Sequence, residues 1–208
     1  MADTNLVLFL TASLVVIVAP GPDNILVLTR GVARGRSAAL VSASGASIGL
    51  VVHSSFAAVG LSALLAQSTV AFSVVKYVGA AYLIYLGVRA LLDREGFAAQ
   101  REVGPIPLRR VFTQAVASNV LNPKIAVFFL AYLPQFADPA TGGTALQLLA
   151  LGLAFALLTL AIFSAIAVFS GTIGSGLRTR PRLAGGLGWL TGCVLIFLGL
   201  RLALQDRR

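Results

Sequence analysis

Six polar side chains lie within or beside long apolar segments, where they could bind an ionic solute or carry a proton. They are Asp23, Asn24, His53, Asn119, Asn122 and Lys124. A charged group at membrane depth is costly unless it faces a cavity or a partner, so these residues are candidates for function. The alternative for Asp23 is a loop just outside the bilayer, with the carboxylate capping the next helix.

Prolines interrupt two apolar segments next to these polar residues. The residues of the breaks are Pro20, Gly21 and Pro22 in the first segment and Pro123 in the second. Proline lacks a backbone N–H and its ring clashes with the preceding helical turn, so neither helix can continue straight. We therefore expect two broken helices, and the free N–H groups of the half-helix that follows each break favour an anion.

Asp23 and Lys124 are the obvious pair across the two breaks. Each would be expensive to bury alone, and mutual attraction lowers the cost for both. The same side chains could instead divide around a zwitterion, with the carboxylate meeting an ammonium group and the amine meeting a carboxylate. Asp23 is the better candidate for a proton carrier, while His53 is either a proton relay or a neutral hydrogen-bonding residue between helices.

Composition identifies an integral membrane protein. Hydrophobic residues make up 58% of the chain and charged residues 11%, and the mean hydropathy is +0.92, which excludes an ordinary soluble domain. The net charge of +9 sits in short clusters between apolar runs, so the positive-inside rule explains it without a nucleic-acid partner. The single cysteine, Cys193, excludes a paired-thiol redox mechanism.

Six segments are apolar enough to span or nearly span a bilayer. They are about 5–29, 38–66, 70–92, 111–135, 145–171 and 185–205. Most of the 16 basic residues lie in the odd-numbered connections, which predicts that both termini lie outside the cytoplasm. Arg201, close to the C-terminus, disagrees with this orientation. No cleavable signal is expected, because the first residues lack a positive stretch.

The two halves of the chain resemble each other. The segment 83–89 matches 195–201, and at the same offset Tyr77 corresponds to Trp189. Because each half holds three helices, the second half must be inverted, and inverted repeats with paired broken helices are typical of secondary transporters. Chance recurrence of short Leu/Ile/Gly strings is the alternative.

These observations predict one transporter domain over residues 1–208. It is an all-α integral membrane protein with six transmembrane helices, arranged as two inverted three-helix repeats with proline-broken helices 1 and 4. Repeat one covers about 1–92, a connector about 93–110, and repeat two about 111–208.

One motif resembles a hydrolase nucleophile. Residues 45–49 fit the pattern G-x-S-x-G, but that motif requires a strand–turn–helix and here it lies in an apolar segment. His53 lies six residues after Ser47, the serine of this pattern, and so faces another side of the helix. Gly45 and Gly49 fit better as a surface on which two helices pack closely. We therefore expect a protein that is not an enzyme.

Several motifs together resemble the LysE/RhtB family of bacterial amino-acid exporters. They are 20–23 after an apolar first helix, Arg34-Gly35-Arg36, 45–49 followed by His53, the stretch 77–87, and Asn122-Pro123-Lys124. The resemblance covers essentially the whole chain. It implies a multi-pass protein of the bacterial inner membrane that exports amino acids or similar zwitterionic metabolites, in exchange for protons. It also implies roles for Asp23, Asn24, Asn122 and Lys124, and with less support for His53.

Two other functions remain as alternatives. A metal-cation transporter of the same superfamily would need several His, Asp or Glu ligands at membrane depth, and one His with one Asp is too few. A non-catalytic membrane subunit would not call for polar residues beside both breaks. We expect no cofactor and no metal, and the partners are an amino-acid substrate, protons and the lipid bilayer. The glycine-rich helix faces permit a homodimer.

Overall fold

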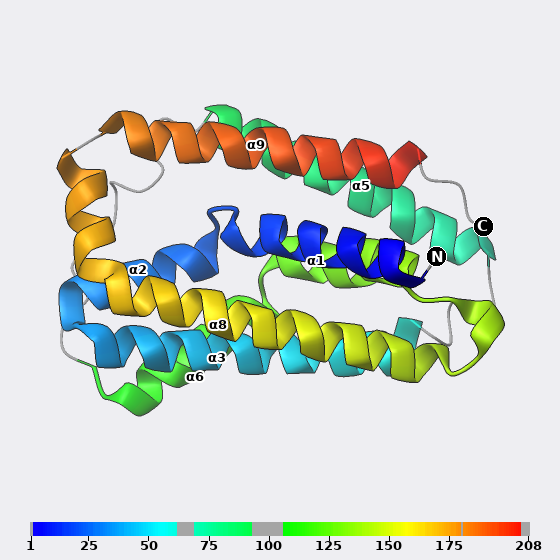
Figure 1. Ribbon diagram of the computed structural model, residues 1–208, viewed down its shortest axis with the longest axis horizontal. Helices are drawn as coiled ribbons and strands as arrows, with labels where there is room; N and C mark the ends of the chain where they lie inside the picture. The colour runs from blue at the N-terminus through cyan, green and yellow to red at the C-terminus, as the bar shows by residue number, and fades with distance from the viewer. Residues whose placement is uncertain (1, 62–68, 93–105, 180, 205–208) are drawn as a thin grey trace.

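The described part of the chain is helical throughout. The computed structural model describes residues 2–61, 69–92, 106–179 and 181–204, and no strand occurs among them. The longer helices are α1 (Ala2–Val18), α2 (Pro22–Arg34), α3 (Arg36–Phe56), α5 (Thr69–Leu92), α6 (Leu108–Val120), α8 (Thr144–Thr179) and α9 (Pro181–Leu204). The shorter ones are η1 (Ala57–Leu61), α7 (Pro123–Val127), η2 (Phe128–Tyr132), η3 (Leu133–Phe136) and η4 (Pro139–Thr141). The predicted all-α class is confirmed (Figure 1).

Both predicted helix breaks are present. Leu6–Val18 and Pro22–Arg34 meet at 53°, and Leu108–Val120 and Pro123–Phe136 meet at 46°. The last backbone bond before the first break runs from the Ala19 N–H to the Val15 carbonyl, 2.9 Å away. The next residue is Pro20, which has no N–H to continue the ladder.

Length and hydropathy define the candidate membrane spans of the described residues. Three helices are long and apolar enough to cross a membrane: Arg36–Gly60, Ser73–Leu92 and Thr144–Ile173. Counting each bent pair as one span gives up to five, and the apolar part of α9, Gly192–Leu204, is shorter than a full span. Among the described residues, length and composition therefore support three of the six predicted spans, and up to five when each bent pair is one span.

Some predicted boundaries differ from the structure. α8 continues to Thr179, beyond the predicted end at 171, and α6 begins at Leu108, inside the predicted connector 93–110. The α-helical part of the second predicted segment ends at Phe56, where the π-helical η1 begins. Positions 62–66 of that segment and 93–105 of the connector lie outside the described residues.

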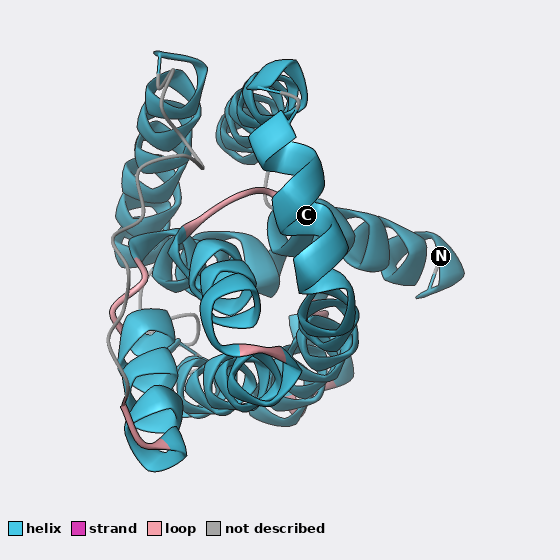
Figure 2. Cartoon of the chain, turned by 90° about the vertical axis from the view of Figure 1, so that its left-hand side faces the viewer, coloured by secondary structure: helices cyan, strands magenta, loops and turns pink. Residues whose placement is uncertain are grey.

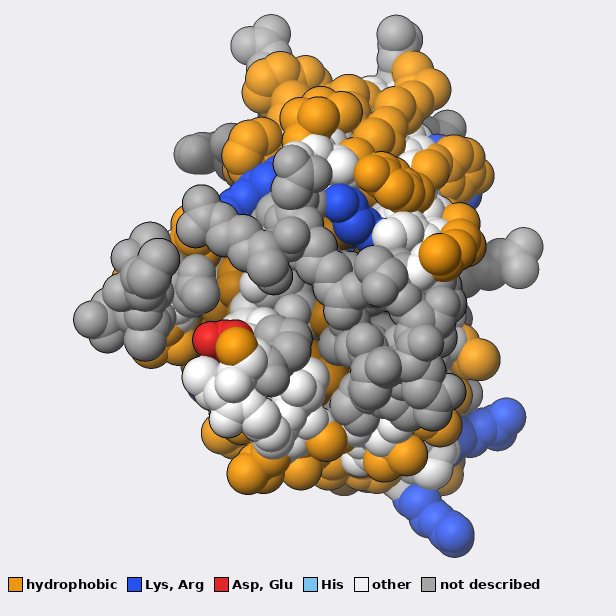
Figure 3. Space-filling model, turned by 90° about the vertical axis from the view of Figure 1, so that its right-hand side faces the viewer, with side chains coloured by type: hydrophobic (Ala, Val, Ile, Leu, Met, Phe, Trp, Pro, Cys, Tyr) orange, Lys and Arg blue, Asp and Glu red, His pale blue; other side chains and the backbone are white. Residues whose placement is uncertain are grey.

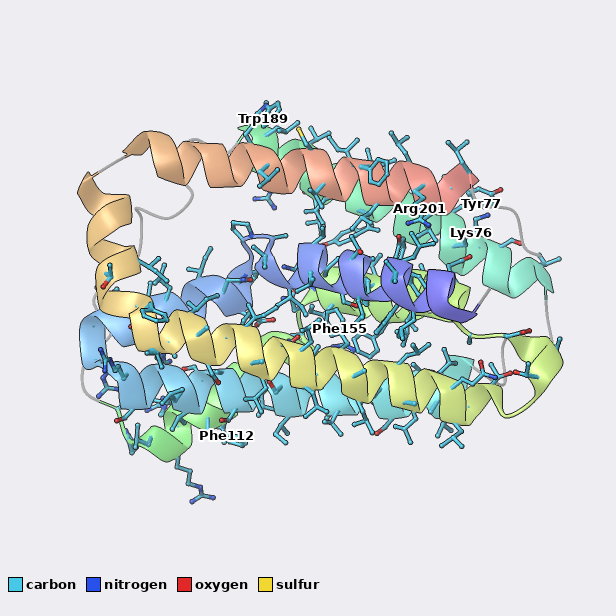
Figure 4. The ribbon with its side chains drawn as sticks, viewed as in Figure 1. Lys76, Tyr77, Phe112, Phe155, Trp189 and Arg201 are labelled. Atoms are coloured by element: carbon cyan, nitrogen blue, oxygen red, sulfur yellow. The ribbon has the colours of Figure 1, made fainter. Side chains whose placement is uncertain are left out.

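The helices run lengthwise along the molecule in two groups. α5 and α9 lie side by side along one edge, and α3, α6 and α8 lie along the other, with α1 between them (Figure 1). Figure 2 shows many of the helices nearly end-on. Aromatic rings fill the middle, where Phe128 and Phe155 have ring centroids 4.8 Å apart, and Phe155 points inward from α8 (Figure 4).

Large apolar side chains cover the outer faces of the bundle. Val18, Val78 and Phe197 are among those that remain more than half exposed. Hydrophobic side chains also surround much of the end shown in Figure 3. Extensive exposed apolar surface marks a face that contacts membrane rather than water.

Candidate functional site

The Asp23 carboxylate lies inside the molecule and is held by the second break. Ser118 Oγ donates to Oδ1 at 3.0 Å, and the side-chain amides of Asn119 and Asn122 donate to Oδ2 at 2.8 and 2.9 Å. Asp23 is 4% exposed. The N-cap of α2 is Gly21, and no side chain caps that end. The carboxylate therefore accepts from side chains of the second break, and no hydrogen bond by which it caps α2 is seen.

Lys124 belongs to the second break and is held by the first, so the two breaks meet in one junction. Its Nζ donates to the carbonyl oxygens of Val16, at 3.1 Å, and Ala19, at 3.0 Å. The Val16 carbonyl would accept from residue 20 in a continuous helix, and Pro20 has no N–H to give. The ammonium thus supplies a missing donor, at the helix end where the macrodipole favours a cation.

Asn24 and Gly21 complete the first break. The Asn24 side-chain amide donates to the Ile17 carbonyl at 2.7 Å, which satisfies another carbonyl freed where α1 ends. A Cβ added to Gly21 would lie 2.9 Å from Lys124 Nζ. A side chain here would press on the end of Lys124, which would have to shift away from its present position beside α1.

Asn122 links the acid to the amine. Its Oδ1 accepts from the Lys124 backbone N–H at 3.0 Å and caps α7, while its Nδ2 donates to Asp23. No hydrogen bond or ion pair joins the Lys124 ammonium to the Asp23 carboxylate directly. The static ion pair that the sequence left open is therefore not formed, although both charges are buried at one junction.

His53 contacts the second break but not Asp23. Its Nε2 lies 3.2 Å from the Asn119 carbonyl oxygen, and its ring centroid is 5.5 Å from that of Phe129. Asn119 therefore stands between the histidine and the Asp23 carboxylate. This position is compatible with either role that the sequence allowed for His53.

The glycines of the G-x-S-x-G string form the predicted packing surface. A Cβ on Gly45 would lie 2.6 Å from the Phe112 carbonyl, and one on Gly49 would lie 2.7 Å from Asn119 Oδ1. Ser47, between them, donates to the Ala43 carbonyl at 3.0 Å within α3. Close approach of α3 and α6 thus helps to place Asn119.

Two carboxamide oxygens at the junction have no hydrogen-bond partner. They are Asn24 Oδ1 and Asn119 Oδ1, both buried. Together with the carboxylate of Asp23 they are buried hydrogen-bond acceptors on residues of the two breaks. Buried acceptors of this kind favour a cationic group such as an ammonium.

An apolar cleft of about 290 Å³ lies against the first break. It is lined by Leu14, Val15, Val18, Ala19, Pro20, Leu190 and Val194. Ala19 belongs to both the cleft and the polar junction, because its carbonyl oxygen accepts from Lys124. The cleft therefore begins where the polar junction ends.

Sequence reasoning missed the part played by two residues. Ser118 binds Asp23 directly, and its position one turn before Asn122 could have indicated this. Arg30 is one of the basic residues that the charge pattern assigned to the odd-numbered connections, yet it is buried, at 4% exposed. The described residues contain no group of three or more His, Cys, Asp or Glu side chains that could hold a metal ion.

The fold and the site together define a class. Helices with apolar outer faces, two bent spans, and polar and charged groups buried where the bends meet are the features of a membrane transporter. Comparison with known proteins gives the particular family. The chain belongs to the LysE type translocator family, whose model matches residues 14–206.

Similar proteins extend over nearly the whole chain. An uncharacterized membrane protein of Pseudomonas aeruginosa is 33% identical, covering 90% of this chain and 89% of its own length. A leucine efflux protein of Klebsiella pneumoniae is 29% identical, covering 96% and 94%, and one of Salmonella typhimurium is 27% identical, covering 94% and 92%. No solved structure matches the chain. The protein is a multi-pass protein of the inner membrane, as members of this family are.

Proposed function

We propose that this protein exports amino acids or closely related zwitterionic metabolites from the cytoplasm by proton antiport. The family and the leucine efflux relatives support amino-acid export. The observation that carries the mechanism is the junction of the two breaks, where Asp23 and Lys124 are both buried without pairing to each other. A zwitterion offers one group to each of them.

The proposed roles follow from the hydrogen-bond partners that Asp23 and Lys124 can give up in favour of the substrate. The substrate ammonium replaces the amides of Asn119 and Asn122 at the Asp23 carboxylate, with the free oxygen of Asn24 nearby. The substrate carboxylate draws the Lys124 ammonium away from the carbonyls of α1. Each exchange replaces one charged hydrogen bond with another, so it changes the free energy little.

Proton coupling is assigned to Asp23. A carboxylate binds either a substrate ammonium or a proton, and the two compete for the same oxygens. A proton arriving from outside therefore displaces the substrate, and the protonated carboxyl resets the protein. His53 is the candidate relay, because Asn119 connects it to Asp23.

The apolar cleft is proposed to receive the side chain of the substrate. Its volume of about 290 Å³ is at the lower end for small-molecule pockets. Its lining is aliphatic, from Leu14 and Val18 on α1 to Leu190 and Val194 on α9. This favours an amino acid with an aliphatic side chain over one with a charged side chain.

We also propose that the single domain is built from two inverted three-helix repeats. Gly87 of α5 lies against the Gly192 carbonyl and Ile196, and Gly199 of α9 lies against the Ala80 carbonyl and Ile84. Both sets of contacts are related by the same shift of 112 residues. The first helices of the two bent pairs correspond at a shift of 102, from Leu6–Val18 to Leu108–Val120, and the second helices begin at Pro22 and Pro123, a shift of 101.

Export and coupling can be tested together. Metabolites in the medium of overexpressing and deletion strains would identify the solute, with leucine as the first candidate. The purified protein in proteoliposomes should then drive leucine uphill against an imposed pH gradient, and a protonophore should stop it. Identical metabolite profiles in the two strains would contradict an export function.

A further inference from the structure

Arg30 is a buried cation whose donors are mostly unused. It lies on α2 and is 4% exposed. Its Nη2 donates to Gln114 Oε1 of α6, while Nε and Nη1 are buried without a hydrogen-bond partner. Its neighbour Arg34 is only half-buried and donates to the Ile106 carbonyl at 2.9 Å. Arg36 is exposed.

Anchoring the end of α2 at the membrane surface does not explain why the Arg30 guanidinium is buried. Arginines that hold a helix end at the membrane surface extend their charged heads into water, as Arg36 does. A buried guanidinium is costly unless a negative group compensates it. Of the acidic side chains that the structure describes, Asp23 accepts hydrogen bonds from the second break and Asp138 is exposed near Gln147. Neither of them compensates the charge of Arg30.

The free donors match a carboxylate. Each of two edges of a guanidinium is a planar fork that fits the two oxygens of a carboxylate, Nε with Nη2 on one and Nη1 with Nη2 on the other, so the edge that Gln114 leaves open can bind one. Gln114 fixes the plane of that fork from α6. The positive charge of Arg34 close by adds to the attraction for an anion.

Arg30 also lies in line with the Asp23 junction. The two residues are seven positions apart on α2, which places them on one helix face about 10 Å apart along the axis. On α6, Gln114 is one turn from Ser118, which binds Asp23. One α2–α6 interface therefore joins the junction to the end of the bundle where α2 ends and α6 begins (Figure 1).

We propose that Arg30, positioned by Gln114, binds the carboxylate of the substrate on its way from the cytoplasm to the Asp23–Lys124 junction. The inference rests on the proposed export function for the identity of the carboxylate. The site itself is an anion site, and a free inorganic anion is the other source of the same chemistry. The substrate therefore enters with its carboxylate ahead of its ammonium, and the carboxylate moves from Arg30 to Lys124.

Thermal melting of the detergent-purified full-length protein tests the anion site without requiring transport. Saturating sodium acetate should raise the Tm of the parent by roughly 4 °C over equal ionic strength of sodium chloride. Arg30→Gln should lose that shift, and the matched control Arg36→Gln, at an exposed arginine outside the site, should keep it. A shift that survives in Arg30→Gln, or an equal one with chloride, would overturn the assignment.

Two further measurements keep the test decisive. In proteoliposomes, Arg30→Gln should raise the KM for leucine roughly tenfold with kcat within about twofold, as expected for lost uniform binding, and Arg30→Lys should restore part of the loss. If Arg30→Gln does not fold, Gln114→Leu should show a reduced acetate shift, and an unchanged shift refutes the role of Gln114. Leucine that is not transported at all, with the acetate shift intact, counts against the substrate and not against the anion site.

Discussion

At the scale of residues, the junction is held by bonds that cross between the two breaks. Lys124 of the second break satisfies carbonyls of the first, and Asp23 of the first accepts from three side chains of the second. Hydrogen bonds to charged groups contribute about 1.5–3 kcal/mol each. Removing either charge therefore affects both breaks at once.

Replacing Asp23 by Asn should abolish proton-coupled export and leave the protein inserted. The carboxamide cannot be protonated at working pH, and it offers one acceptor oxygen to Ser118, Asn119 and Asn122 in place of two. Residual efflux that does not depend on the pH gradient should be roughly tenfold to hundredfold slower than in the parent, because charged hydrogen bonds of this size are lost. The rate of leucine efflux from proteoliposomes as a function of the pH gradient measures it.

The matched control is Asp138→Asn. Asp138 is exposed and binds only its local loop, through Ala140 N–H and Gln147. This variant should export normally. An Asp23→Asn variant with ordinary pH-dependent efflux would remove Asp23 from the mechanism.

Replacing Lys124 by Gln should weaken recognition of the substrate carboxylate and destabilise the first break. The shorter neutral side chain leaves the Val16 or Ala19 carbonyl without a donor, at a cost of about 1–3 kcal/mol. The free energy of unfolding and the KM for leucine should both change. If the parent exports leucine methyl ester as well as leucine, the proposed role of Lys124 is wrong.

Much of the residue-level site could be predicted from the sequence, and the pairing could not. Polar residues beside prolines in apolar segments correctly indicated that Asp23, Asn119 and Asn122 would meet. The direct Asp23–Lys124 ion pair, one of two arrangements that the sequence left open, is not formed, because Pro20 leaves the Val16 carbonyl free and that acceptor takes the ammonium. Arg30 could not be recognised, since burial depends on how α2 packs against α6.

At the scale of elements, glycines set how closely the helices that carry the site approach each other. Gly49 of α3 lies against the side chain of Asn119, and a Cβ on Gly152 of α8 would collide with Ser54 Oγ of α3. Packing without side chains at these points lets polar residues on neighbouring helices reach one another. The positions of the site residues thus depend on contacts between helices.

Gly49→Ala should disturb the site through packing alone. The new Cβ would lie 2.7 Å from Asn119 Oδ1 and 2.8 Å from its Cβ, so α3 and α6 must separate or Asn119 must turn. Overpacking of this kind costs about 1–3 kcal/mol. A lower Tm and slower leucine efflux are expected together.

Gly171→Ala is the control for this substitution. A Cβ at Gly171 of α8 meets nothing within 4 Å, so the change should leave both stability and efflux essentially unaltered. Equal behaviour of the two variants would show that the α3–α6 contact does not position Asn119.

The sequence predicted which helices break but not where every helix ends. Proline chemistry is local, so the bends of 53° and 46° were foreseeable as breaks. The π-helical stretches η1 and η2, and the extension of α8 to Thr179, have no such local marker. They depend on packing against other helices.

At the scale of the whole molecule, the odd-numbered connections gather toward one side. The α2–α3 junction, the start of α6 and the α8–α9 junction lie at one end, and the start of α1 and the end of α9 lie toward the other (Figure 1). Arg201, which disagreed with the predicted orientation, is half-buried and donates to the Tyr132 hydroxyl at 3.3 Å. Figure 4 places it near Lys76 and Tyr77. Its charge thus belongs to an interhelical contact.

Cysteine labelling of intact cells should give the orientation. In a Cys193→Ser background, single cysteines at Arg36 and Arg109, both exposed, should react with an impermeant maleimide only from the cytoplasmic side. A cysteine at Gly142, exposed at the opposite end between η4 and α8, should react only from outside. The reverse pattern would invert the topology and, with it, the direction of entry at Arg30.

The missing backbone N–H of Pro20 bears on which solutes can leak through the transporter. A bond within a helix breaks only when the helix unwinds, but the Lys124–Val16 bond can be given up by one side chain changing its rotamer. Under the proposed mechanism, only a solute with its own carboxylate draws that ammonium away. The joint between α1 and α2 is then released on the outward step only when such a solute is bound, so an amine without a carboxylate does not leak out through the transporter.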